Sequence, residues 1–192
     1  MKMTPNINDS TMKYPVRPIP LHIDIQENEW GFALKDLIYP YIQGATKITI
    51  YDPYIREGYQ IKNLVALLER ALDEEGLVGV LLVTNPVFPD MDKHIEWVNR
   101  MEKLRRSLTM REVQFEVSID PTLHDRRIVM DSGWVVIPGR GLDTYKFNDY
   151  FEIGATDERY RLWHATKIDT LFIPELDEIG YAEKYPENKT VQ

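Results

Sequence analysis

Residues 77–84 form a nearly uninterrupted apolar run, LVGVLLVT, that is followed by Asn85-Pro86. The run is too short to cross a membrane, and its length suits a β-strand rather than a helix. A strand that is apolar at almost every position is typical of a sheet that helices cover on both faces. We therefore expect a layered α/β fold with this strand inside the sheet.

Helical and strand patterns alternate on both sides of this run. Apolar residues between 61 and 72 recur with the i, i+3, i+4, i+7 spacing of an amphipathic helix. Alternation of this kind predicts βα units and a sheet that is parallel in part. We expect helices over residues 30–42, 61–72 and 93–109, and strands over residues 21–25, 46–51, 77–84, 113–117, 127–131, 134–138, 151–154 and 168–173.

The composition fits one globular domain with polar ends. Four prolines punctuate residues 1–20, so we expect an extended arm there, a domain over residues 21–174 and a charged tail over residues 175–192. No apolar run reaches the ~18 residues of a membrane-spanning helix, and the first residues lack the apolar core of a secretory signal. We expect a soluble cytoplasmic protein.

Charge and residue types narrow the classes of function. The chain has no cysteine, which excludes a disulfide scaffold, an iron–sulfur cluster and a thiol nucleophile. The four histidines lack the spacing of metal ligands, and no nucleotide-binding glycine motif occurs, so we expect neither a metal nor a cofactor. A net charge of −8 argues against bulk coating of nucleic acid but is compatible with a local basic site.

The sharpest chemical pattern is H-x-R-x4-D, formed by His124, Arg126 and Asp131 at the start of one expected strand. In a strand, residues 124 and 126 point to the same face, so an imidazole and a guanidinium can meet one ligand. Arginine suits phosphate because its planar fork binds two oxygens at once. Phosphodiester cleavage uses the same groups, with the imidazole as nucleophile and a carboxylate that orients it. The pattern predicts a site that faces phosphate; a structural ion-pair cluster is the alternative.

Further polar residues occupy positions where α/β sheets place functional loops. Asp52, Tyr54 and Arg56 follow the strand expected over residues 46–51, where they either line a site or fix their own loop. Arg140 and Asp143 lie in a glycine-containing loop whose backbone amides could hold an anion, and a plain surface loop is equally compatible with this pattern.

Five motifs together resemble one family, the phospholipase D-like domain found at the C-terminus of MIT-domain proteins. The central motif is similar to H-x-K-x4-D of the phospholipase D superfamily, with Arg126 in place of lysine. The resemblance covers residues 21–173 and rests on Asp52-Pro-Tyr-Ile-Arg56, His124-Asp-Arg126, Gly133-Trp134, Gly139-Arg-Gly-Leu-Asp143 and His164-Ala-Thr166-x-x-Asp169.

The resemblance implies a fold and a chemistry. The fold would be a single phospholipase D-like half, a mixed sheet flanked by helices, which pairs into a homodimer so that two motif histidines face each other. In active members one histidine attacks phosphorus to form a phosphohistidine and the other protonates the leaving oxygen, without a metal. By this resemblance His124 is nucleophile or acid, Arg126 is the phosphate cation and Asp131 is the orienting carboxylate. His164 and Thr166 also fit the family pattern.

Two departures from the active pattern favour binding over catalysis. Arg126 replaces the usual lysine, and the element expected as Gly-Ser-x-Asn reads Gly139-Arg-Gly-Leu-Asp143. We therefore expect a dimeric binding module for a phosphate-bearing or acidic ligand (a lipid headgroup or a nucleic acid) or for a protein partner, with an AAA+ ATPase among the conceivable partners. The alternatives are a metal-independent phosphodiesterase or nuclease and a purely structural dimerisation domain.

Overall fold

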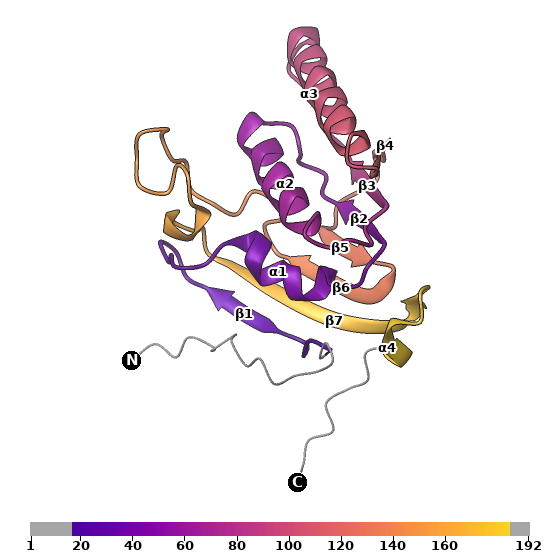
Figure 1. Ribbon diagram of the computed structural model, residues 1–192. Helices are drawn as coiled ribbons and strands as arrows, with labels where there is room; N and C mark the ends of the chain where they lie inside the picture. Colours follow the sequence, from indigo (N-terminus) through magenta and orange to yellow (C-terminus); the bar gives the residue numbers. More distant parts are fainter. Residues whose placement is uncertain (1–16, 185–192) are drawn as a thin grey trace.

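The computed structural model describes residues 17–184, and in these residues seven strands form a single sheet (Figure 1). The strand order is β1-β7-β6-β5-β2-β3-β4; β2, β3 and β4 are parallel, and all other neighbours are antiparallel. The strands are β1 (His22–Ile25), β2 (Lys47–Tyr51), β3 (Gly79–Thr84), β4 (Gln114–Ile119), β5 (Arg127–Met130), β6 (Ser132–Pro138) and β7 (Thr166–Asp177). The fold is α/β with a mixed sheet, as the alternating pattern predicts.

Three helices pack on one face of the sheet: α1 (Leu34–Ile42), α2 (Gly58–Ala71) and α3 (Met91–Thr109) (Figure 1). The crossovers from β2 to β3 and from β3 to β4 move in the same direction across the sheet, and because such crossovers are right-handed they place α2 and α3 on the same side. No helix among residues 17–184 is long and apolar enough to cross a lipid bilayer.

The core lies between these helices and the sheet. Ile48 and Ile50 of β2 are buried on the helix side, next to Val80 and Leu82 of β3. Trp134 of β6 is fully buried, and its ring lies 5.0 Å from Tyr41 of α1 and 5.4 Å from Phe172 of β7, measured between ring centres. The core thus joins the parallel and the antiparallel halves of the sheet.

The opposite face of the sheet is not covered by α1, α2 or α3, which corrects one expectation. The apolar run over residues 77–84 predicts a strand buried on both faces, whereas Leu81, which points away from the helices, is only half-buried. A hollow of about 270 Å³ lies there, lined by Lys47, Thr49, Leu81 and Glu116 among others. β3 lies between β2 and β4, so its apolar composition reflects this interior position in the sheet and not a second helical layer.

The structure also differs from the sequence expectation near the C-terminus. The charged sequence from residue 175 predicts a tail, but β7 continues to Asp177 and is followed by α4 (Tyr181–Lys184). Both carboxylate oxygens of Asp177 accept hydrogen bonds from α4, from the amides of Tyr181 at 2.7 Å and Ala182 at 2.9 Å, and Tyr181 is buried. Most of the expected arm, residues 1–16, and the end of the expected tail, residues 185–192, lie outside the described residues.

No strand forms over residues 151–154. The alternation of Phe151, Glu152 and Ile153 predicts one, but these residues form turns in an exposed loop between β6 and β7. The loop is followed by a short 3₁₀ helix, Glu158–Tyr160.

Candidate functional site

The topology brings most of the predicted site residues to one edge of the sheet. β2 and β6 end at this edge, whereas β5 and β7 begin there because they run antiparallel to those neighbours. Asp52 directly follows β2, Arg126 directly precedes β5, residues 139–143 follow β6, and Thr166 is the first residue of β7. Residues that are more than a hundred positions apart in the sequence therefore become neighbours.

Asp52 is the buried carboxylate at this edge, with 2% of its surface exposed. One oxygen accepts a hydrogen bond from the backbone amide of Tyr54 at 3.0 Å, and the other accepts one from the amide of Leu142 at 2.9 Å. Burial raises the pKa of the Asp52 carboxyl, while the two amide donors and the nearby guanidinium of Arg126 oppose that rise. Asp52 thus joins the loop after β2 to the loop after β6.

The guanidinium of Arg126 is held in place by three neighbours. Its Nε lies 3.9 Å from Asp52 Oδ1, its Nη1 donates a hydrogen bond to the carbonyl of Gly139 at 3.2 Å, and its Cζ lies 4.5 Å from the centre of the Tyr54 ring. The Arg126 side chain is still 29% exposed, and its buried Nε has no hydrogen-bond acceptor among the described residues. The fork is therefore oriented, and it retains unused donors.

Thr166 adjoins the carbonyl that orients Arg126. Gly139 donates its amide to the carbonyl of Lys167 at 2.8 Å. A Cβ placed on Gly139 would lie 3.1 Å from the Thr166 hydroxyl and 3.0 Å from the Lys167 carbonyl oxygen. The loop after β6 is thus packed closely against the start of β7.

Arg140 and Asp143 form a small network that sequence reasoning did not fully predict. Arg140 donates to the carbonyl of Asp143 at 2.9 Å and lies 3.5 Å from its carboxylate. The hydroxyl of Tyr59, from α2, donates to the same carboxylate at 3.0 Å. Partial burial and the Asp143 charge raise the pKa of Tyr59 to about 12. Arg140 is therefore turned toward its own loop.

Asn63, like Tyr59, is a residue of this region that the sequence analysis did not identify. Its amide nitrogen donates to the carbonyl of Leu142 at 2.7 Å, and its amide oxygen accepts from Arg161 at 3.1 Å. Asn63 is buried on α2. A polar residue beside the apolar stripe of the helix was the signal that could have identified it, because buried amides need partners.

His124 is exposed in the segment between β4 and β5, two residues from Arg126. Hydrogen bonds from Thr122, with a smaller contribution from the charge of His124, lower the pKa of Asp120. Asp120, which follows β4, is thus one carboxylate near the His124 segment.

Asp131 lies at the other end of β5. Its carboxylate accepts a hydrogen bond from the amide of Thr46 at 2.9 Å and another from the Thr46 hydroxyl, at the start of β2. The four residues Arg127–Met130 separate Asp131 from Arg126, which corresponds to roughly 16 Å at about 3.3 Å per residue. The motif carboxylate and the motif imidazole do not meet within one chain, contrary to the arrangement expected from the sequence, because an extended strand holds them apart.

The side chains of His164 and Arg56 have neighbours other than Arg126. His164 Nδ1 is 3.7 Å from Glu27, a residue after β1 whose pKa falls to about 2, mainly through a hydrogen bond from Lys146. Arg56 lines a pocket of about 150 Å³ together with Lys93 and Arg100 of α3. The structure thus brings together Asp52, Tyr54, Arg126 and Thr166, whereas the side chains of His164 and Arg56 contact other groups.

The described part of the chain contains no cluster of side chains that could serve as metal ligands. Within residues 17–184, no group of three or more His, Asp or Glu side chains is arranged to hold a metal ion. The groups available at this edge include the oriented guanidinium of Arg126 and, two residues earlier in the sequence, the exposed residue His124.

Comparison with known proteins assigns this chain to the phospholipase D-like domains. A family model described as "Phospholipase D-like domain at C-terminus of MIT" matches residues 31–172, and the chain belongs to this family, which confirms the resemblance in the motifs. The chain is also similar to MIT domain-containing protein 1 from Mus musculus, with 29% identity over 149 residues. The match covers 77% of this chain and 59% of the mouse protein, so the chain spans about three fifths of the length of that relative.

Proposed function

We propose that this chain is a dimeric phospholipase D-like module that binds a phosphate group at the sheet edge through Arg126. The observation that carries the proposal is the fixed guanidinium. Asp52, Tyr54 and Gly139 hold it while leaving 29% of the side chain exposed. A pre-oriented fork loses less conformational freedom on binding and can donate two parallel hydrogen bonds to phosphate oxygens.

The neighbours of Arg126 fit an anionic ligand. Asp52 supplies a negative charge, but it is buried and already accepts two backbone amides. His124 is an exposed residue of the same segment and adds a donor when it is protonated. Arg140 contributes only after it leaves Asp143, so we give it a secondary role.

The decisive experiment measures phosphate binding by Arg126 variants. We expect Arg126→Gln to weaken the affinity for inorganic phosphate about tenfold or more, because a charge-assisted hydrogen bond contributes about 1.5–3 kcal/mol. Arg126→Lys keeps the charge but loses the fork, and it should fall between the wild type and the glutamine variant. Isothermal titration calorimetry on folded protein gives these affinities.

Arg127→Gln is the matched control. It removes the same charge one residue further along, from a side chain that stacks on Tyr51 at 4.2 Å and pairs with Asp125 at 3.6 Å. Successive strand residues point to opposite faces, so Arg127 should contribute little to the site. Equal losses in the Arg126 and Arg127 variants would mean that net charge rather than the oriented fork attracts phosphate.

Two sources of the phosphate group can be separated with defined probes. Vesicles of phosphatidylcholine with phosphatidylserine present the group on a membrane, and single-stranded DNA presents it on a nucleic acid. The Arg126→Gln variant should lose binding to the physiological source and retain only residual, salt-sensitive binding to the other. If neither probe nor inorganic phosphate binds, the proposal is wrong.

A further inference from the structure

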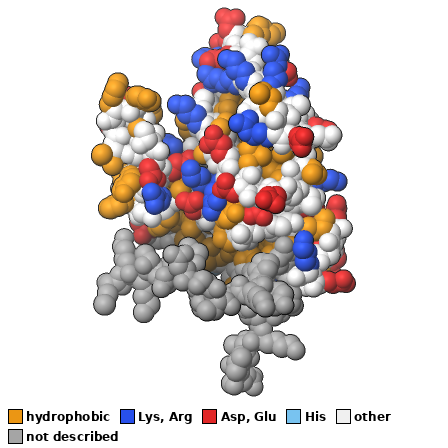
Figure 2. Space-filling view, in the orientation of Figure 1, with side chains coloured by type: hydrophobic (Ala, Val, Ile, Leu, Met, Phe, Trp, Pro, Cys, Tyr) orange, Lys and Arg blue, Asp and Glu red, His pale blue; other side chains and the backbone are white. Residues whose placement is uncertain are grey.

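Aromatic side chains are exposed in two neighbouring segments, the turn after β1 and the loop between β6 and β7. Together with one isoleucine they form a surface that we call the aromatic face. It consists of Trp30 and Tyr160, which are 53% and 50% exposed, and of Phe147, Tyr150, Phe151 and Ile153, which are each between 76% and 92% exposed. Figure 2 shows hydrophobic side chains gathered on the projecting loop. Single exposed apolar residues are normal, but a group of this kind marks an interaction surface.

The two segments form one continuous surface. The amide of Gly31 donates a hydrogen bond to the carbonyl of Arg159 at 2.7 Å, so the turn after β1 is bound to the 3₁₀ helix that follows the loop. The rings of Trp30 and Tyr160 stack across this junction, with their centres 6.3 Å apart. Figure 1 shows the turn after β1 beside the 3₁₀ helix.

The base of the aromatic face is anchored in the core. Trp163 is fully buried, and its ring lies 4.9 Å from the ring of Tyr145. The indole of Trp163 donates to the carbonyl of Phe32 at 3.2 Å, and the hydroxyl of Tyr145 accepts from the amide of Leu34 at 2.7 Å. These contacts fix both ends of the loop.

The tip of the loop is ordered by its own hydrogen bonds. The carboxylate of Asp149 accepts from the amide of Phe151 at 3.0 Å, and the carboxylate of Glu152 accepts from the amide of Asp149 at 2.9 Å. The rings of Tyr150 and Phe151 contact each other edge to face at 5.3 Å. The rings are therefore presented in a defined conformation, which lowers the entropic cost of docking.

The charges around the rings define the chemistry of the occupant. Residues 26–31 and 146–162 contain six acidic side chains and three basic ones. Each basic side chain is already engaged by a polar neighbour within the chain. These pairs are Lys146 with Glu27 at 2.6 Å, Arg159 with Asp157 at 2.6 Å and Arg161 with Asn63 at 3.1 Å. The surface therefore offers no spare cation to an anionic ligand.

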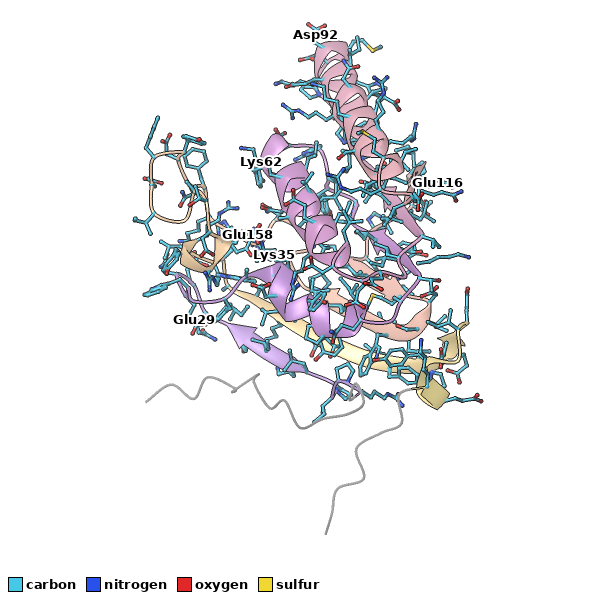
Figure 3. All side chains as sticks on the ribbon, in the orientation of Figure 1. Glu29, Lys35, Lys62, Asp92, Glu116 and Glu158 are labelled. Atoms are coloured by element: carbon cyan, nitrogen blue, oxygen red, sulfur yellow. The ribbon has the colours of Figure 1, made fainter. Side chains whose placement is uncertain are left out.

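Three exposed carboxylates of the same segments lack a counter-ion. Among residues 17–184, no ion pair involves Glu29, Asp149 or Glu152. Their hydrogen-bond partners are backbone amides, including the amide of Gln26, which donates to Glu29 at 2.7 Å. Glu29, labelled in Figure 3, lies in the turn after β1, and the other two lie in the loop. The aromatic face is thus flanked by uncompensated negative charge.

This charge selects against lipids and nucleic acids. Aromatic platforms that stack bases lie in positively charged grooves, and an anionic membrane surface repels acidic segments. Insertion of the rings into a neutral bilayer would carry carboxylates toward the hydrocarbon, which is costly. A cationic protein segment meets none of these penalties.

We propose that the aromatic face binds a segment of a partner protein in which arginine side chains alternate with apolar ones. The guanidinium groups stack on the exposed rings and donate to the three free carboxylates, while the apolar side chains cover the loop. The chain uses the same contact internally, because Arg126 lies 4.5 Å from the centre of the Tyr54 ring. The inference goes beyond the proposed function, since this surface attracts charge of the opposite sign to phosphate.

A synthetic peptide tests the proposal. The probe is a short peptide in which arginine alternates with leucine, labelled with fluorescein, and its affinity for the wild-type chain is measured by fluorescence anisotropy. We expect the corresponding lysine peptide to bind several-fold more weakly, because an ammonium group lacks the planar fork and stacks less well on rings. The corresponding glutamate peptide should not bind. Equal affinities for the arginine and glutamate peptides would overturn the proposal.

Removal of the three charges tests the role of the carboxylates. The triple variant Glu29→Gln, Asp149→Asn and Glu152→Gln retains an oxygen at each position that can accept the same backbone amides, so the loop should keep its order. We expect it to bind the arginine peptide roughly threefold to tenfold more weakly, because three exposed ion pairs are lost.

A matched triple variant controls for net charge. Glu69→Gln, Glu75→Gln and Glu116→Gln remove the same charge from exposed positions away from the aromatic face. Glu116, also labelled in Figure 3, lies on β4, at the opposite edge of the sheet from β1. This variant should bind the arginine peptide like the wild type. Equal losses in the two triple variants would mean that the overall charge of the chain attracts the peptide, and the proposal would be wrong.

The aromatic rings are tested separately from the carboxylates. Tyr150→Ser with Phe151→Ser keeps Asp149, Glu152 and their hydrogen bonds, and it should weaken binding of the arginine peptide about tenfold. Met110→Ser removes an apolar side chain that is 84% exposed at the end of α3, and it should leave the affinity unchanged. Undiminished binding by the double serine variant would overturn the proposal.

Two further measurements separate this surface from the phosphate site and from a membrane contact. Arg126→Gln should bind the arginine peptide like the wild type, so failure of phosphate to bind leaves this proposal intact, and failure of the peptide leaves the phosphate site intact. Vesicles of phosphatidylcholine should not bind through the aromatic face. If they bind the wild type but not the Tyr150→Ser, Phe151→Ser variant, while the peptide does not bind, the occupant is lipid and the proposal is overturned.

Discussion

The carboxylate of Asp52 fills the space that a side chain at Gly141 would need. A Cβ on Gly141 would lie 2.1 Å from Asp52 Oδ2 and 2.7 Å from Arg126 Cδ, and the residue has a φ of +60°. The loop after β6 can therefore close over the Asp52–Arg126 pair only with glycine at this position. The amide of Leu142, the next residue, then donates to the same Asp52 oxygen.

Gly141→Ala should destabilise the protein and disturb the phosphate site together. A left-handed conformation costs a non-glycine residue about 1–2 kcal/mol, and the clash with Asp52 adds to this cost. Chemical denaturation gives the change in the free energy of unfolding. Gly180→Ala is the control, because Gly180 has a similar φ of +67° and a Cβ there would meet nothing within 4 Å; equal losses in the two variants would show that the clash has no effect.

Asp131→Ala should lower stability without changing phosphate affinity. The Asp131 carboxylate joins β5 to Thr46, and leaving such donors without their acceptor costs about 1–3 kcal/mol. The free energy of unfolding should fall by this amount. Thr46→Val should have a smaller effect in the Asp131→Ala background than alone, because the two residues share one interaction. If the Asp131→Ala variant is well folded and nevertheless binds phosphate more weakly, Asp131 contributes to the phosphate site.

The case of Asp131 shows where sequence reasoning reached its limit. Local patterns predicted the helices α2 and α3 and the strands of the parallel half, because burial imposes regular apolar spacing on them. They also singled out Asp52 and Arg126, but not their contact, which depends on the antiparallel placement of β5 beside β2. The four residues between Arg126 and Asp131 form the strand β5, which places the two side chains at opposite ends of that strand. The spacing in the sequence does not give this separation until the secondary structure is known.

Residues 147–153, in the loop between β6 and β7, show a second limit of prediction from sequence. Alternation of Phe151, Glu152 and Ile153 has the period of a strand, but no strand among residues 17–184 pairs with these residues, and the carboxylates of Asp149 and Glu152 bond to local amides. Local hydrogen bonds of acidic side chains favour turns over strands. The sequence therefore predicted the apolar character of this segment and not its exposure.

Tyr59→Phe should change the alkaline pH dependence of stability. The pKa of Tyr59 rises from 10.0 to about 12 in the folded state, so between these values the folded chain retains a proton that the unfolded chain has lost. The free energy of unfolding of the wild type therefore falls as pH rises through this window. The phenylalanine variant lacks this contribution, and the difference in unfolding free energy between the two proteins should shrink as pH rises. A difference that stays constant above pH 10 would mean that Asp143 does not hold the phenol proton.

His124→Ala addresses the phosphodiesterase alternative. His124 is exposed near Arg126, but Asp131 is held by Thr46 at the far end of β5, so the imidazole lacks the orienting carboxylate of its own motif. An imidazole without its orienting carboxylate is a weaker nucleophile, and we expect no turnover of bis(p-nitrophenyl) phosphate or of single-stranded DNA in the presence of EDTA. The His124→Ala variant should then differ from the wild type only in a modest loss of phosphate affinity at a pH where the imidazole is charged. Turnover that persists in EDTA and vanishes in His124→Ala would instead make the chain a metal-independent phosphodiesterase, with the histidine of a second copy as the natural source of the missing acid.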